Sequence, residues 1–289
     1  MDLTRVRLGY IVAVLLYGTV GLVVRYVNLP SEVIVLFRGT FGALSVLAYM
    51  LARGRRPDAA AIRTNLRWLL AGGVCLGLNW VFLFAAYVHT TVAMASLCNY
   101  MAPIIVIAIS PFAFGERIGP RRIACVLVAF VGIALVSNLP EATSGGVNVV
   151  GLALGMLAAL SFVGVVFCNR HLHDIESLDR VVVQLSISAA VVLPYALAMN
   201  GGLPLAGLDA RSWLLLALLC VVQTGIAYIF YFGAMGVLPV LEVALLGYIE
   251  PVTSVICSAL VLGEPMGVLG WVGAAMVIAA AAAGELVQE

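Results

Sequence analysis

The sequence predicts an all-α integral membrane protein whose ten transmembrane helices form two five-helix repeats of inverted topology. Three observations predict this class: the composition, a succession of apolar segments, and an internal duplication. Of the 289 residues, 64% are hydrophobic and 10% are charged, and the mean hydropathy is +1.15. A soluble domain carries about 25% charged residues. Most of this chain is therefore expected to lie in lipid.

The apolar segments set the expected helices. A helix needs about 20 apolar residues to cross the hydrocarbon of a bilayer, and ten such segments occur. We expect helices at 7–27, 31–52, 67–88, 91–114, 118–138, 147–169, 179–199, 211–232, 239–262 and 266–285. The first segment runs into Arg25 without a cleavage site of small residues, so it is interpreted as a retained helix and not as a signal peptide.

A duplication relates the two halves of the chain. Residues 77–119 align without a gap on residues 225–267 and share twelve identities in forty-three positions. Apolar composition alone does not place scarce residues in register, as seen in Tyr100 on Tyr248, Pro103 on Pro251 and Gly115-Glu116 on Gly263-Glu264. We interpret this as an internal repeat, with a first unit at 1–139 and a second at 140–289.

Arginine placement predicts the orientation. If the N-terminus is cytoplasmic, only Arg25 and Arg211 face outward, and twelve arginines face inward: Arg5, Arg7, Arg53, Arg55, Arg56, Arg63, Arg67, Arg117, Arg121, Arg122, Arg170 and Arg180. Cytoplasmic loops retain positive charge, so both termini are expected inside. Five helices in each half make the second copy enter from the opposite side, with Glu116 cytoplasmic and Glu264 exterior. Inverted repeats are typical of secondary transporters, which bind substrate near the midplane.

Two prolines indicate a midplane cavity. Pro103 and Pro251 lie near the middle of the fourth and ninth segments, and each removes a helical hydrogen bond. The freed carbonyls of Asn99 and Gly247 cannot be satisfied by lipid, so the inner faces of these helices are the candidate cavity. A kink needed only for packing is the alternative.

The Gly-Glu pairs are interpreted as structural. Gly115 and Gly263 can take the left-handed conformation that ends a helix. Glu116 and Glu264 are then expected beside the positive N-terminal end of the next helix. Pro120 or Pro265 fits the opening turn of that helix.

Two ionisable residues lie within apolar segments. Glu250 adjoins Pro251, and Arg38 is seven residues beyond Ser31, roughly 10 Å inside the outer boundary. Charges at such depth are functional candidates by default. One interpretation is an Arg38–Glu250 ion pair that locks two helices; the other is that Glu250 holds an ammonium group or a proton and Arg38 a carboxylate. Glu242 is expected at a hydrated inner rim.

Aromatic residues follow one helical face. Trp80, Phe84 and Tyr87 are spaced at i, i+4 and i+7. Their duplicated counterparts include Tyr228 and Phe232, and with Tyr100 and Tyr248 they would form a wall for flat or apolar groups and attract an amine. Packing and lipid anchoring are the alternatives.

These residues resemble a known family. The paired apolar helices with a central Pro and a terminal Gly-Glu, Arg38 in the second helix and the count of ten helices resemble the EamA type of the drug/metabolite transporter superfamily over about 5–138 and 147–286. Members of that family export amino acids and other small metabolites. Asn99-Tyr100-Met101-Ala102-Pro103 is similar to a pattern in the bacterial aromatic amino-acid exporter, whereas the second copy reads Gly247-Tyr248-Ile249-Glu250-Pro251.

We therefore expect an inner-membrane, multi-pass secondary transporter that exports a small amphiphilic metabolite by alternating access. Among such metabolites, an amino acid, aromatic or apolar, is the leading candidate. Exporters of other cationic or aromatic compounds, a nucleobase carrier, a lipid flippase and a membrane enzyme are the alternatives. The expected partners are the substrate and membrane lipid, with no nucleic acid, cofactor or metal, and no catalytic residue. A solvated loop explains His171, His173, Asp174 and Glu176. Small residues at Gly151, Gly155 and 274–284 suit close helix packing, within the chain or in a homodimer.

Overall fold

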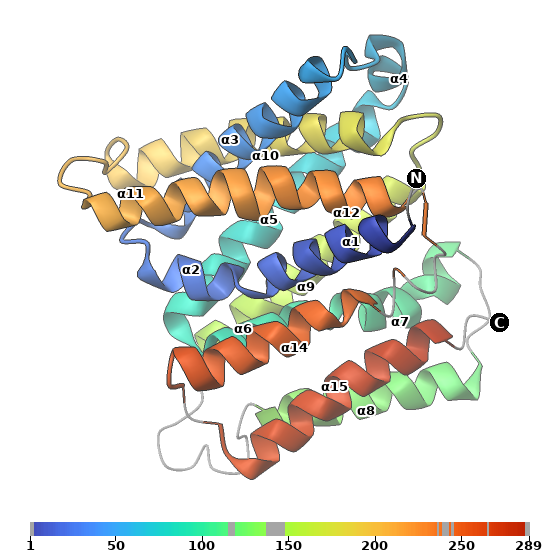
Figure 1. The fold of residues 1–289 in the computed structure, drawn as a ribbon. Helices are drawn as coiled ribbons and strands as arrows, with labels where there is room; N and C mark the ends of the chain where they lie inside the picture. The colour runs from blue at the N-terminus through green and yellow to red at the C-terminus, as the bar shows by residue number, and fades with distance from the viewer. Residues whose placement is uncertain are drawn as a thin grey trace.

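The computed structural model describes residues 3–114, 119–136, 148–235, 237–238, 243, 246–264 and 266–286, and these residues form helices and short connections without a strand (Figure 1). The helices are α1 Leu3–Gly18, α2 Val20–Tyr26, α3 Ser31–Ala52, α4 Ala59–Thr64, α5 Leu66–His89, α6 Val92–Asn99, α7 Ala102–Phe114, α8 Pro120–Val136, α9 Val149–Arg170, α10 Ser177–Asn200, α11 Ala210–Ala217, π-helix η2 Leu218–Ile226, α12 Ala227–Met235, α14 Ile249–Ile256, π-helix η3 Cys257–Val261 and α15 Val268–Leu286.

The described helices have the length and surface of membrane spans. Six stretches are long and apolar enough to cross a bilayer, and four shorter apolar helices lie at 92–106, 123–132, 249–261 and 268–280. Large apolar side chains point outward, for example Leu260 at 76% exposure and Val268 at 80%. Helices that are apolar on all sides suit a lipid environment. The all-α membrane class is thus confirmed for the described residues, and the count of ten crossings stays a prediction.

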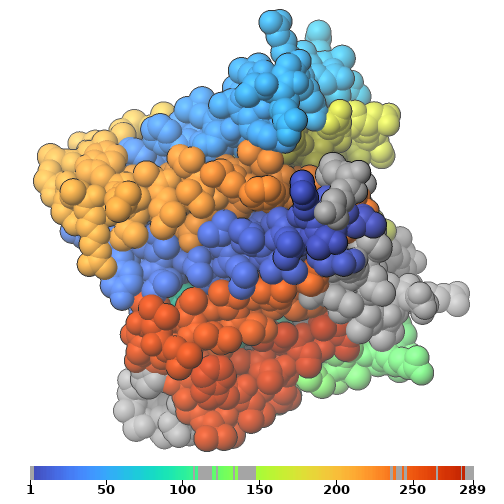
Figure 2. All heavy atoms as spheres, viewed as in Figure 1, coloured from blue at the N-terminus to red at the C-terminus, as the bar shows by residue number. Residues whose placement is uncertain are grey.

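The helices pair across the two halves of the chain. α3 packs on α10 at one edge of the bundle, α8 packs on α15 at the other, and α6 packs on α14 between them (Figure 1). α5 packs along α9 and α1 along α12. On the face shown in Figure 2, α1 fills the space between α12 and α14.

Antiparallel packing defines two ends of the bundle. The Asn200 amide donates to Glu32 at one end of the α3–α10 pair (2.8 Å), and Arg55 contacts Asp179 at the other end (3.1 Å). We call the end with α4 the basic end, because Arg53, Arg55, Arg56, Arg63 and Arg67 follow α3 there. The other end, with the turn between α2 and α3, is called the far end.

Glycines set the closest approach of α9. A Cβ added at Gly151 would lie 2.7 Å from the Cβ of Thr90, and one added at Gly155 would lie 2.7 Å from the Cβ of Cys98. On α15 the small-residue face is buried against α8, where a Cβ at Gly132 would meet the carbonyl of Gly273 at 2.8 Å. These faces are used within one chain, and a homodimer stays a prediction without support from them.

Candidate functional site

The helices that contain Pro103 and Pro251 are interrupted at matching positions. Helix four consists of α6 and α7, which are separated at Tyr100 and Met101, and helix nine is interrupted at Tyr248, directly before α14. The two tyrosines have nearly the same backbone conformation, with φ −72° and ψ −2° at Tyr100 and φ −69° and ψ −8° at Tyr248. Each interruption comes three residues before a proline, which has no N–H for the helical ladder. The expected break is present in both helices.

The two breaks lie side by side. The Ala93 amide donates to the Ser258 hydroxyl (3.1 Å), and the Ser254 hydroxyl donates to the Ser96 hydroxyl (2.8 Å). Residue numbers rise along α6 as they fall along α14, so these helices are antiparallel. The same register brings Tyr100 level with Glu250, and the phenol and the carboxyl group interact.

Arg38 is buried on an aromatic platform. Its side chain is 5% exposed, and its Nε donates to Thr224 Oγ1 at 2.8 Å. The guanidinium carbon lies 4.0 Å from the ring centroid of Trp80 and 5.6 Å from that of Phe84, which is cation–π geometry. The Thr224 hydroxyl in turn donates to the Leu219 carbonyl within η2 (2.8 Å).

The expected locking ion pair is absent, so that interpretation of Arg38 and Glu250 is wrong. Both residues are described, and no direct ion pair joins them. The reason is geometric, because Arg38 is directed to Trp80 and Thr224 whereas Glu250 is directed to Tyr100. A buried basic group and a partly buried acidic group are therefore held near each other without a direct ion pair.

A tyrosine cluster surrounds Glu250. Tyr17, Tyr228 and Tyr231 lie within electrostatic range of its carboxylate. The ring of Tyr17 meets those of Tyr228 (5.6 Å) and Tyr231 (5.5 Å) edge-on, and Tyr10 stacks on Tyr231 at 5.1 Å. Sequence reasoning missed Tyr10, Tyr17 and Tyr231, although the seven-residue spacing of the first two on α1 places them on one face.

The predicted aromatic wall divides into two parts. Phe84 is fully buried and Tyr87 is 4% exposed, and their rings stack at 5.9 Å within the core. The Tyr87 hydroxyl also contacts the Ser96 hydroxyl (3.3 Å). Tyr228 and Phe232 are only partly buried and meet at 5.5 Å. Phe84 and Tyr87 therefore contribute packing, and the accessible aromatic surface lies on α12 and α1.

Asn99 has a structural partner that sequence reasoning missed. The Asn79 amide donates to Asn99 Oδ1 (2.8 Å) and to the Ala158 carbonyl (2.8 Å). This hydrogen-bonded amide connects α5, α6 and α9. The signal in the sequence was a single amide within an otherwise apolar segment. Of the other predicted residues, Pro251 is buried and Pro103 and Tyr248 are partly buried, and Tyr248 packs in the core with α6 and α15.

Glu264 does not lie where it was expected. Its carboxylate accepts hydrogen bonds from the Val92 amide (2.8 Å) and the Ser258 hydroxyl, and it pairs with Arg25 (2.7 Å). It therefore caps α6, not the helix that follows it, because the antiparallel packing of α6 and α14 brings the start of α6 to the end of η3. Gly263 has the expected positive φ of 64°, and Pro120 begins α8. Gly115, Glu116, Glu242 and Pro265 lie outside the described residues.

The loop after α9 is tied to the turn before α5. His171 stacks on Trp68 at 4.4 Å, and the Asn65 side chain donates to the His173 carbonyl at 2.7 Å. Glu176 pairs with Arg55. Across the described ranges no three His, Cys, Asp or Glu side chains form a metal-binding group.

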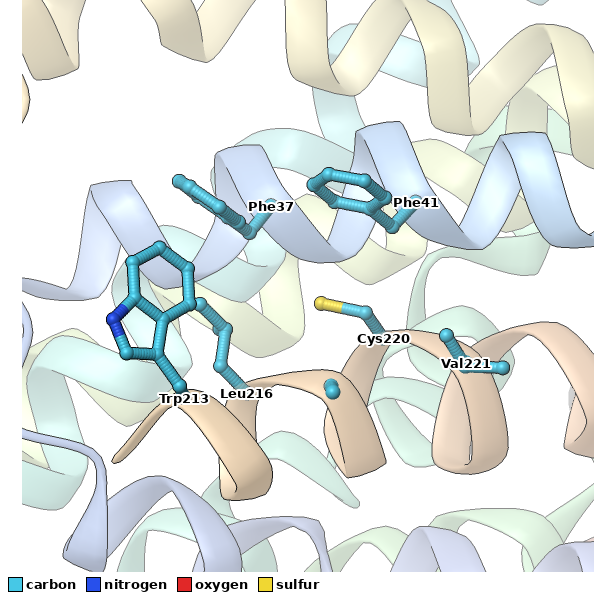
Figure 3. A pocket seen from close by; sticks show the side chains of 7 residues that line it. Phe37, Phe41, Trp213, Leu216, Cys220 and Val221 are labelled. Carbon is cyan, nitrogen blue, oxygen red and sulfur yellow. The ribbon is translucent and has the colours of Figure 1, made fainter. Parts of the chain in front are cut away.

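An apolar groove lies between α3 and the helix formed by α11 and η2. It has a volume of about 170 Å³ and is lined by Phe37, Phe41, Trp213, Leu216, Ala217, Cys220 and Val221 (Figure 3). Its lining carries no charged side chain, so it lacks the groups that would orient a polar substrate. We therefore place the candidate site at Arg38, Glu250 and the tyrosine cluster.

Comparison with known proteins gives a consistent result. Residues 6–138 and again 149–283 match the family described as the EamA-like transporter family. The chain is 22% identical to the transporter YxxF of Bacillus subtilis over 93% of this chain and 86% of that one. It is 28% identical to a transporter of Archaeoglobus fulgidus over 93% of this chain and 92% of that one. The pseudopaline exporter CntI of Pseudomonas aeruginosa is 32% identical over 52% of this chain and 51% of its own. A crystal structure that covers 98% of both chains at 22% identity and a TM-score of 0.67 shares the fold.

Proposed function

The chain belongs to the EamA-like transporter family and is a multi-pass inner-membrane transporter. We propose that it exports a small amphiphilic metabolite, with an amino acid as the leading candidate. Transport would occur by alternating access, with the site at Arg38 and Glu250 open to one side at a time. CntI is named as an exporter, and this name supports outward transport of the substrate from the cytoplasm. The bound molecule would lie between the tyrosine cluster and the two helix breaks.

The proposed architecture is ten crossings in two inverted repeats, 1–139 and 140–289, with both termini cytoplasmic. Three features support it. α3, α6 and α8 each pack on their own counterparts, α10, α14 and α15. The α3–α10 and α6–α14 pairs are antiparallel. Finally, the arginines gather at the basic end, and this distribution supports a cytoplasmic location for that end.

One observation carries the choice of an amino acid: the site holds a buried basic group, Arg38, and a partly buried acidic group, Glu250, that are not paired with each other. An uncompensated charge in a low-dielectric site is costly. A zwitterion supplies both missing partners, with its carboxylate at Arg38 and its ammonium group at Glu250. The tyrosine rings then contact its side chain and add cation–π attraction for the amine.

Transport by purified protein in liposomes tests the proposal. We expect counterflow of radiolabelled L-phenylalanine within a panel of amino acids, measured with and without an imposed pH gradient. A fluorescent lipid in the same liposomes should keep its original leaflet. Lipid movement without amino-acid counterflow would favour a flippase, and movement of phenethylamine alone would favour an exporter of cationic compounds.

A single substitution tests the role of Glu250. Glu250→Gln keeps the shape and removes the charge, so we expect counterflow of amine-bearing substrates to be lost. The matched control is Glu32→Gln at the far end, where the carboxylate contacts only the neutral Asn200 amide among the described side chains. A Glu250→Gln protein with an unchanged rate and pH dependence across roughly pH 5 to 8 would exclude the role of Glu250 in binding or proton transfer.

A further inference from the structure

A second arginine is held against an aromatic ring inside the bundle. Arg180, in the first turn of α10, is half-buried, and its guanidinium carbon lies 5.4 Å from the ring centroid of Phe232. Phe232 is the duplicated counterpart of Phe84, which lies 5.6 Å from the guanidinium carbon of Arg38. Each half of the bundle thus places an arginine beside the same repeated phenylalanine.

The charge of Arg180 has no acidic partner in the described part of the chain. The nearest acids in sequence, Glu176 and Asp179, are both bound to Arg55. The N-terminal end of a helix is itself positive and disfavours a cation. The guanidinium group of Arg180, held beside Phe232, is therefore available to an anion.

Aromatic contacts connect Arg180 to the candidate site. Phe232 meets Tyr228 at 5.5 Å and Tyr231 at 5.1 Å, and both tyrosines meet Tyr17 beside Glu250. These rings form a continuous row along α12 and α1. A molecule moving along the row would pass from Arg180 to the tyrosine cluster without leaving aromatic surface.

The two arginines lie at different depths. Gly39, next to Arg38, packs against Ala189 of α10, where an added Cβ would lie 3.1 Å from the Ala189 Cβ. Ala189 is nine residues beyond Arg180, which places the arginines about 14 Å apart along the helix axis. The backbone positions of the two arginines are therefore separate along the bundle, as two distinct subsites require.

We propose that Arg180 forms a second carboxylate-binding subsite, at the basic end, which receives the substrate carboxylate from the cytoplasm before it reaches Arg38. This inference rests on the proposed export of an amino acid. It assigns Arg180 to loading of the substrate and Arg38 to the deeper site. An anionic lipid headgroup has the same chemistry, but the Phe232 contact directs Arg180 toward α12 and favours the substrate.

Sidedness of transport gives the sharpest test. In oriented liposomes, Arg180→Gln should raise the KM for L-phenylalanine presented at the basic end by roughly 10-fold or more, and leave the KM from the far end unchanged. Arg180→Lys should restore part of the affinity. The matched control is Arg53→Gln, since Arg53 also lies by a ring, that of Tyr49 at 5.6 Å, but is exposed. An equal rise from both sides, or a rise that depends on anionic lipid and not on the substrate, would overturn the proposal.

Binding of 3-phenylpropionate, which has no amine, separates this inference from the proposed function. The unaltered protein in neutral detergent should bind it, and Arg180→Gln should weaken binding at least several-fold while circular dichroism stays unchanged. Such a loss would support the carboxylate subsite even if no amino acid is transported. Equal binding by the two proteins, or no binding by either, would overturn it.

Discussion

The breaks in helices four and nine have the same backbone but different side-chain chemistry. In the first break, the Asn99 amide oxygen is bound by Asn79, and the helix is anchored to α5 and α9. In the second, Glu250 faces Tyr100 and the tyrosine cluster. The duplicated position of Glu250 is Ala102, and that of Asn79 is Ala227. One break is therefore held by a structural hydrogen bond, and the other carries a charge.

The same division is found between α3 and α10. Arg38 is the eighth residue of α3, and Gln184, the eighth residue of α10, donates to Asn169 at 2.8 Å. Thr224, which binds Arg38, lies one residue before the aligned stretch, and Leu76 is at the matching position in the first half. The proposed duplication would account for the shared backbone geometry of the two breaks, whereas the side chains at matching positions of the two halves differ.

The largest expected effect tests the charge at the eighth position of α3, where α10 has the neutral Gln184. Arg38→Gln gives α3 the side chain that α10 has, and kcat/KM for L-phenylalanine should fall by about 100-fold, as expected for loss of a charge-assisted hydrogen bond in a buried site. Radiotracer counterflow in liposomes measures it. Arg211→Gln is the control, because Arg211 also contacts a ring, that of Tyr26 at 4.7 Å, but is exposed at the far end. Similar losses in both variants would contradict the comparison.

A pair of glycines tests whether the two breaks differ in function. An added Cβ at Gly18 would lie 2.7 Å from the Glu250 carbonyl, and one at Gly155 would lie 2.7 Å from the Cβ of Cys98. Both Gly→Ala changes should lower the free energy of unfolding by about 2 kcal/mol, because the packed helices must move apart.

Only Gly18→Ala should also reduce counterflow, since it displaces the helix that carries Glu250. Thermal unfolding in detergent and counterflow measured on the same preparations separate the two effects. Gly233→Ala is the control for both, because an added Cβ there meets no atom within 4 Å. Equal loss of transport in both glycine variants would show that the two breaks are functionally equivalent.

The amide at the first break should matter for stability more than for transport. Asn79→Ala leaves the Asn99 oxygen and the Ala158 carbonyl without their donor. The free energy of unfolding should therefore fall by about 1 to 2 kcal/mol. Ser186→Ala is the matched control, because that hydroxyl only donates within its own helix, to the Val182 carbonyl. The unfolding midpoint reports the difference, and a midpoint equal to that of the control would contradict the anchoring role.

The smallest expected effect concerns the cap at the far end. Glu264→Gln removes the charge that pairs with Arg25, a partly exposed contact, and retains an oxygen for the Val92 amide. We expect the free energy of unfolding to fall by about 0.5 to 1 kcal/mol. This loss should be smaller at high salt, because salt already screens the ion pair. Unfolding midpoints at low and high salt check this, and a loss that grows with salt would refute the ion-pair contribution.

The features readable from the sequence are local. Segment composition predicted apolar helices, and Pro103 and Pro251 predicted that two of them are bent, because a missing N–H interrupts a helix wherever the helix packs. The exact positions of the interruptions, at Tyr100 and Tyr248, came from the structure. The partners of the charges were not readable. Thr224 for Arg38, Asn79 for Asn99 and Val92 for Glu264 are pairings between different helices, and helices that are apolar on all sides give no periodicity to identify the inward face.

The sequence by itself determined the membrane class, the repeat and which ionisable residues lie within apolar segments, since these follow from composition and order along the chain. Only the tertiary structure decided that Arg38 and Glu250 are close without pairing, that Tyr17 and Tyr231 join the site, and that Glu264 caps α6. The physical reason is that burial makes each buried polar group require a partner, whereas the packing of distant helices determines which partner it finds.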